Sequence, residues 1–268
     1  MKKLLDFFQN KALRIEKRFR FVISAAALSL LMLTSTFFLF EKALMFIALF
    51  LVLGYFFTYF SLLEGIERIE WFTLFLMPII LTVSFYLFYF LFPVRWLTRL
   101  PFIFLYGISI YAVLLCSNIF NVGVEKSLQL YRAAFSVNFF YQMGVSFLFN
   151  NALFSFRLNF LINSILVFLA AFLLAFQLIW SVKLDLKVER TTILYGLFIG
   201  LVIGEIALLS SFVPLKSTIV ALFLASSYYS LSGLIYSYLD QRLFKETIRS
   251  YVSVWMVVFA IMILSLQW

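Results

Sequence analysis

The sequence contains no histidine, and this absence excludes several classes of catalytic chemistry. Serine–histidine triads, HExxH zinc sites and histidine-based acid–base catalysis all require an imidazole. The single cysteine, Cys116, rules out an internal disulfide and a zinc site made of several cysteines. Neither a P-loop nor a GxGxxG segment occurs in the sequence. We therefore expect no metal, no cofactor and no enzymatic activity.

Charged residues are also scarce, at 12% of the 268 residues, whereas soluble domains average about 25%. Hydrophobic residues make up 65% of the chain, and phenylalanine alone accounts for 37 positions. Four prolines and nine glycines leave little room for irregular segments. This composition predicts an all-α, polytopic transmembrane helix bundle and not a membrane anchor with a soluble domain.

Long apolar runs predict nine membrane spans, because a helix needs about 20 apolar residues to cross a bilayer. The spans cover residues 21–40, 43–63, 72–92, 101–120, 134–156, 160–181, 193–215, 217–239 and 251–268. Eight spans are the alternative, if one segment in the first half is re-entrant. Residues 21–268 are then expected to form a single transmembrane domain.

The basic residues predict the orientation of these spans. Residues 1–20 carry seven Lys/Arg and form either a solvated cytosolic tail or an amphipathic surface helix. With this end cytosolic, 16 of the 21 Lys/Arg are cytosolic, in accordance with the positive-inside rule. The other five are Lys42, Arg95, Arg99, Arg157 and Lys216. The net charge of +9 thus indicates a multi-pass protein of the inner (plasma) membrane and not a nucleic-acid partner.

Glu205 is the only charged residue that this layout places deep inside a span. It lies about 18 Å from the start of the span 193–215, close to the bilayer midplane. An ionisable group at that depth is costly, so it indicates a function or a dedicated partner. The following span forms an antiparallel hairpin with this one. That hairpin brings Ser226, Ser227 and Tyr229 to the depth of Glu205 as expected partners. The carboxyl either holds helices together as a neutral acid or carries a proton or ion.

Two further patterns concern contacts between helices. Gly196, Gly200 and Gly204 recur every four residues, a spacing that lets another helix approach closely. Since successive helical residues are about 100° apart, Glu205 does not lie on this glycine stripe.

On the predicted span 134–156, Asn138, Gln142 and Ser146 form one polar stripe at i, i+4 and i+8. Such groups hydrogen-bond between helices in a membrane, or else they line a hydrophilic path.

Two segments resemble a known family. They are SNIFNVGVEKSLQLYRAAFSV (117–137) and GEIALLSSFVPLKSTIVALFLASSYY (204–229). They are similar to an uncharacterised family of polytopic membrane proteins encoded by reduced-genome bacteria of the candidate phyla radiation (Patescibacteria). The matching positions include Asn118, Asn121, Arg132, Glu205 and Pro214. The resemblance implies a helical membrane fold and a bacterial origin, but no activity.

We expect a non-enzymatic membrane protein with a structural, assembly or partner-binding role. Aspartyl intramembrane proteases need two aspartates within the membrane, whereas Asp6, Asp185 and Asp240 lie in predicted cytosolic segments. The alternative function is a small transporter or channel that uses Glu205 and the polar stripe. Expected partners are the lipid bilayer and either another membrane protein or a second copy of the chain.

Overall fold

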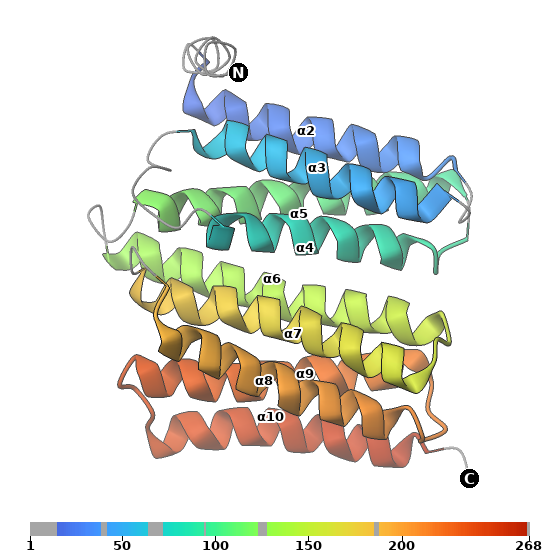
Figure 1. The fold of residues 1–268 in the computed structure, drawn as a ribbon, viewed down its shortest axis with the longest axis vertical. Helices are drawn as coiled ribbons and strands as arrows, with labels where there is room; N and C mark the ends of the chain where they lie inside the picture. The colour runs from blue at the N-terminus through green and yellow to red at the C-terminus, as the bar shows by residue number, and fades with distance from the viewer. Residues whose placement is uncertain are drawn as a thin grey trace. The chain divides into compact units, whose positions relative to one another are not determined.

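The computed structural model describes residues 15–38, 42–63, 72–93, 95–122, 128–184 and 188–266. All regular structure in these ranges is helical, as the composition predicts (Figure 1). The helices are α2 (Lys17–Ser35), α3 (Ala43–Leu62), α4 (Phe72–Tyr89), α5 (Trp96–Val122), α6 (Leu128–Ser155), α7 (Phe160–Lys183), α8 (Arg190–Ser210), α9 (Ser217–Leu239) and α10 (Lys245–Leu264). The all-α fold class is therefore confirmed.

Among the described residues, eight helices are long and apolar enough to cross a membrane. The other one, α6, has 28 residues but is more polar, because it carries Asn138, Gln142, Asn150 and Asn151. The fold is thus that of a helical membrane protein. The departure from nine apolar spans comes from the amides of α6 and not from a re-entrant segment in the first half.

Several helices differ in their ends from the predicted spans. α8 ends at Ser210, five residues before the predicted end at residue 215, and its last turn is closed by a hydrogen bond from Ser211 N to Ala207 O. α5 begins at Trp96, so Pro101 lies inside the helix and not at its start. α10 begins at Lys245 and includes charged residues that hydropathy assigned to a loop. In α5 and α10, backbone hydrogen bonding begins before the apolar run that defined the predicted span. In α8, it stops before the apolar run ends.

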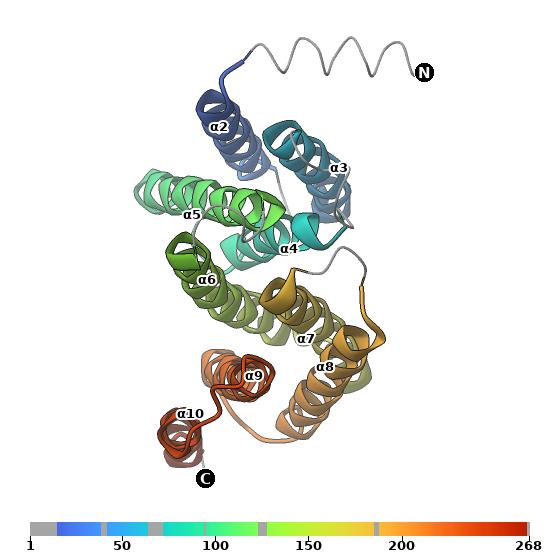
Figure 2. The ribbon, with the colours of Figure 1, turned by 90° about the vertical axis from the view of Figure 1, so that its left-hand side faces the viewer.

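The chain forms two compact units, Met1–Asn138 and Phe139–Trp268. In the first unit, α2 packs against α3 and α5, and α4 packs between α3 and α5 (Figures 1 and 2). Pro78 lies inside α4 and has no N–H to donate to Leu74 O. The hydroxyl of Ser117 on α5 donates to this carbonyl instead, at 3.3 Å. The proline therefore links α4 to α5 as well as bending α4.

In the second unit, α7 and α8 form the most extensive helix pair, and α9 contacts both of them. The last helix, α10, packs on α9 (Figure 2). None of the α10 side chains is buried, and α9 is the main helix against which α10 packs. The core of the unit consequently lies among the second half of α6, α7, α8 and α9.

Candidate functional site

One buried amide, Gln142, joins three helices of the second unit. Its Nε2 donates to Leu174 O on α7 at 3.1 Å and also to the side-chain oxygen of Gln177. Its Oε1 accepts a hydrogen bond from Tyr228 OH on α9 at 2.9 Å. Gln142, Gln177 and Tyr228 are all fully buried. We call these three side chains the Gln142 network, and its hydrogen bonds tie α6 to both α7 and α9.

The remainder of the predicted polar stripe is also buried. Asn138 and Ser146 are almost inaccessible, and Asn150 Nδ2 donates to Ser146 Oγ at 3.3 Å within α6. Stripe residues thus bond within α6 and, at Gln142, across to α7 and α9. The sequence analysis selected Gln142 as a member of the polar stripe but named no partner for it, and Tyr229 was expected beside Glu205 instead. The structure gives Gln142 the adjacent Tyr228. No local pattern points to this pair, because Gln142 and Tyr228 are 86 residues apart in the chain.

Glu205 lies on the exposed face of α8, not in the helix core. Among the described residues, its carboxyl makes no hydrogen bond and no ion pair. Because α8 ends at Ser210, the residue is about 8 Å from the end of the helix and not at its middle. The carboxyl therefore has neither the internal position nor the internal partner that the sequence analysis expects.

The structure gives each of the three expected partners of Glu205 a different contact. Ser226 Oγ donates to Phe223 O of its own helix at 2.9 Å. Ser227 Oγ accepts from the indole N–H of Trp255 on α10, also at 2.9 Å. Tyr229 stacks on Phe139 with ring centroids 5.2 Å apart. Counting residues from the turn predicts depth in the membrane but not the direction in which a side chain points. In the structure these three side chains therefore contact groups other than Glu205.

The glycine stripe faces α7 and is buried there. A Cβ at Gly200 would lie 2.9 Å from Phe172 Cβ and 3.1 Å from Phe168 O. A Cβ at Gly204 would lie 2.9 Å from Phe168 Cβ. The close approach also allows Ser164 Oγ to donate to Gly204 O at 2.8 Å. The three glycines therefore make room for the backbone of α7.

The opposite side of α8 presents a second stripe, which we call the outward stripe. It consists of Leu194, Phe198, Leu201, Glu205 and Leu209, at intervals of four, three, four and four residues. It continues to Phe212, two residues beyond the end of α8, whose ring centroid lies 5.2 Å from that of Phe160. All six side chains are exposed. Glu205 is the polar member of this otherwise apolar surface. α8 thus has one face packed on α7 and another face exposed in the structure.

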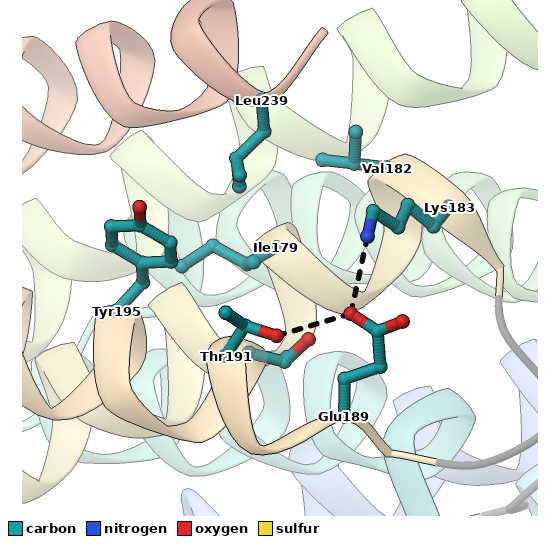
Figure 3. A pocket seen from close by; sticks show the side chains of 8 residues that line it. Ile179, Val182, Lys183, Glu189, Thr191, Tyr195 and Leu239 are labelled. Atoms are coloured by element: carbon teal, nitrogen blue, oxygen red, sulfur yellow. Dashed lines mark hydrogen bonds and ion pairs between the residues drawn. The ribbon is translucent and has the colours of Figure 1, made fainter.

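A small pocket lies at the junction of α7, α8 and α9 (Figure 3). It is lined by Ile179, Val182, Lys183, Glu189, Thr191, Thr192, Tyr195 and Leu239. Lys183 Nζ and Thr191 Oγ1 both lie 3.1 Å from Glu189 Oε2, and Figure 3 shows both groups pointing at this carboxylate. The hydrogen bond from Lys183, followed by that from Thr191, lowers the pKa of Glu189. With a volume of about 20 Å³, the pocket has room for one water and not for a substrate.

Among the described residues, no group of three or more histidine, cysteine, aspartate or glutamate side chains could hold a metal ion. The polar groups of the second unit are mainly amides and hydroxyls bonded to one another. Such an arrangement can hold helices in register.

A family model described as "Protein of unknown function (DUF5656)" matches residues 67–265. This range contains α4 to α10, and with them the Gln142 network and Glu205. The match agrees with the uncharacterised family expected from segments 117–137 and 204–229. No curated protein and no solved structure matches the chain.

Proposed function

We infer a function for this chain, which belongs to the DUF5656 family of proteins of unknown function. It is a non-enzymatic, multi-pass protein of a bacterial inner (plasma) membrane, with its N-terminus in the cytosol. It acts by assembly, binding a second copy of itself through the outward stripe of α8. The observation that carries this proposal is the exposed carboxyl of Glu205, which has no partner among the described residues.

A carboxyl group that faces lipid is energetically costly. Insertion scales put an aspartate at the centre of a span at about +2.5 to +3.5 kcal/mol, and this is an upper bound for Glu205 because it lies about 8 Å from the end of α8. A hydrogen-bonding partner on another helix offsets part of this cost, by about 0.6 to 1.7 kcal/mol for each bond. In the proposed dimer the two Glu205 carboxyls share at least one proton, so that one donates and the other accepts. Self-association therefore satisfies Glu205 without requiring a different protein.

The spacing of the outward stripe supports a paired helix. Intervals of four and three residues keep side chains on one seam, as in helices that pack along their length. Two copies in one membrane share its orientation, so a two-fold axis along the membrane normal brings each residue next to its own equivalent. Glu205 then meets Glu205, with Leu201 and Leu209 one turn away on either side.

The transport alternative requires Glu205 and the polar stripe of α6 to share a water-filled path. Glu205 is exposed on α8, whereas Gln142 is buried between α7 and α9. A proton flux in lipid vesicles that Glu205→Gln abolishes would support transport over assembly.

Disulfide trapping tests the assembly directly. The native Cys116 is buried and does not compete with an introduced cysteine. We expect Leu209→Cys to form a cross-linked dimer on oxidation of native membranes, because the two-fold axis places the two cysteines side by side. The matched control is Val257→Cys, which is equally exposed to lipid but lies on α10. This control should remain monomeric.

Variants of Glu205 then identify the group responsible. Glu205→Gln keeps a donor and an acceptor and should retain the Leu209→Cys cross-link, whereas Glu205→Leu should lose it. Equal cross-linking in both variants would overturn the role of the carboxyl. Cross-linking of Leu209→Cys to a different protein would replace the second copy with another partner.

A further inference from the structure

Arg99 on α5 is a buried cation that has no carboxylate partner among the described residues. Its side chain is 8% exposed, and neither ion pair between described residues includes it. Nε donates to Tyr89 OH at 3.0 Å, and one terminal nitrogen, Nη2, donates to Thr36 O at 3.1 Å. The guanidinium carbon also lies 4.7 Å from the ring centroid of Phe37 and 5.5 Å from that of Trp96. These four contacts fix the position of the guanidinium. No carboxylate among the described residues neutralises its charge.

The N–H donors of the Arg99 guanidinium that make no hydrogen bond in the structure are the ones left for a ligand. A guanidinium carries five N–H donors, and the two bonds above occupy Nε and Nη2. Nη1 donates to no described acceptor, and Arg99 has no further partner. Nη1 is also not among the unpaired polar atoms that are sealed from the surface. This nitrogen therefore keeps some exposed surface.

Two other cations lie at the same end of the first unit, where α2 ends and α3 and α5 begin. Arg95 precedes Arg99 by one helical turn and is exposed. Lys42 stands at the start of α3, with its Nζ 4.9 Å from the ring centroid of Phe38. Neither residue forms an ion pair with another described residue. Glu41, the acidic residue of this connection, lies outside the described residues. Arg95, Arg99 and Lys42 thus lie at one end of the first unit, and together they favour the binding of an anion there.

The rim of this site is apolar. Its exposed side chains include Phe37, Leu91, Phe92, Trp96, Leu97 and Leu100. Leu97 is 85% exposed, and tryptophan at the end of a span is typical of the membrane interface. A small hydrated anion gains nothing from such a rim, whereas a lipid with acyl chains does. The geometry indicates a ligand with an anionic head and apolar tails.

We propose that Arg99, with Arg95 and Lys42, binds the phosphate of an anionic phospholipid. A fixed planar guanidinium is suited to phosphate oxygens, which accept hydrogen bonds along its N–H directions. The hydrogen bonds to Tyr89 OH and Thr36 O orient the guanidinium of Arg99. The exposed cations Arg95 and Lys42 add electrostatic attraction for the head group. The acyl chains then lie along the apolar surface of α5.

Native mass spectrometry of the full-length protein in detergent tests this site. Phosphatidylglycerol is titrated against phosphatidylcholine, and the bound fraction of each is measured. We expect phosphatidylglycerol to bind more tightly, and Arg99→Gln to remove this preference. Arg95→Gln should weaken phosphatidylglycerol binding by about fivefold, the effect of one basic residue near an anionic surface. Lys216→Gln, which removes an exposed cation of the other unit, is the matched control and should change nothing.

Two variants of the exposed cations and a competition with inorganic phosphate show whether the site binds a lipid, a small anion or neither. If Arg99→Gln does not fold, Arg95→Gln and Lys42→Gln decide the question, because both residues are exposed. Unchanged binding of phosphatidylglycerol in both of these variants would overturn the proposal. Displacement of the lipid by millimolar inorganic phosphate would overturn the lipid assignment in favour of a small-anion site. Neither result depends on Glu205, so the lipid site and the proposed assembly fail separately.

Discussion

Gly204 and Glu205 are neighbours on α8, yet they face opposite surroundings. Gly204 is buried against Phe168 of α7, whereas Glu205 is exposed on the outward stripe. Successive helical residues point about 100° apart, so one helix can present two distinct faces within a single turn. In α8 the glycine face is committed to α7, and the carboxyl face remains free for another molecule.

The glycine face predicts a clear cost for added volume. In Gly200→Ala, the new Cβ would lie 2.9 Å from Phe172 Cβ and 3.1 Å from the Phe168 carbonyl. Since a backbone atom cannot move away cheaply, we expect a loss of about 1 to 3 kcal/mol in the free energy of unfolding. Denaturant unfolding of the purified protein, followed by circular dichroism, measures this change.

The matched control is Gly144→Ala on α6. A Cβ at Gly144 would meet nothing within 4 Å. Alanine is a better helix former than glycine by about 1 kcal/mol, so this variant should be as stable as the wild type or slightly more stable. Equal destabilisation by the two substitutions would show that the close contact of α8 with α7 is not the cause.

The Gln142 network predicts that replacing Gln142 lowers the free energy of unfolding more than replacing Tyr228. Gln142 takes part in all the hydrogen bonds of the network and Tyr228 in one of them. Gln142→Leu leaves Tyr228 OH without its acceptor and the Leu174 carbonyl without its side-chain donor. Unpaired buried groups cost about 1 to 3 kcal/mol, so the unfolding free energy should fall by that amount. Tyr228→Phe removes a single bond and should cost about 0.6 to 1.7 kcal/mol. Chemical denaturation in one detergent compares the two.

Tyr238→Phe is the control for these variants, because Tyr238 is on the same helix but exposed. We expect no change in stability there. In the double variant Gln142→Leu with Tyr228→Phe, the two costs should not add, because both substitutions break the same bond. Strict additivity would contradict a direct interaction between Gln142 and Tyr228.

The sequence analysis predicted the helical membrane fold because long apolar runs and few charges leave no other stable arrangement. It also selected Gln142, because amides four residues apart must share a helix face. The direction of Glu205 was predictable only in part, since counting residues gives depth along a helix, whereas rotation follows from which face packs. The glycines already indicated that face, and Glu205 lies outside it.

Arg99 was missed for a related reason. The sequence analysis counted it as one of five cations on the side opposite the cytosol. Its burial depends on Thr36 and Tyr89, which are 63 and 10 residues away in the chain. Such distant contacts leave no local pattern that a single sequence can reveal.

The attachment of α10 predicts a local effect that leaves the rest of the protein unchanged. A Cβ at Gly233 would overlap the ring of Tyr251, whose carbonyl accepts a bond from Ser230 at 3.0 Å. We expect Gly233→Leu to push α10 from α9 and to increase amide hydrogen exchange in residues 245–264. Gly54→Ala is the control, because its Cβ would be in ordinary contact with Ile79 at 3.6 Å. Faster exchange throughout the second unit would contradict a separable α10.

The ion pair between Lys183 and Glu189 predicts a pH dependence at the start of α8. Their hydrogen bond, 3.1 Å long, and the bond from Thr191 lower the pKa of Glu189 in the folded state. A carboxyl with a lowered folded pKa adds stability above its unfolded pKa, about 4.3, and loses this contribution as the pH falls through the folded pKa. Wild type should therefore melt at a higher temperature than Glu189→Gln at pH 7. The gap should close in strong acid.

Salt and a second carboxyl separate this effect from general acid denaturation. Both partners of the pair are largely exposed, so the difference in melting temperature should be small and should shrink further in about 1 M salt, where the screening length falls to about 3 Å. Glu246→Gln on α10 is the control, because Glu246 has no ion pair among the described residues. A gap for Glu189→Gln that stayed constant from neutral pH to strong acid would mean that Glu189 acts through its shape and not its charge.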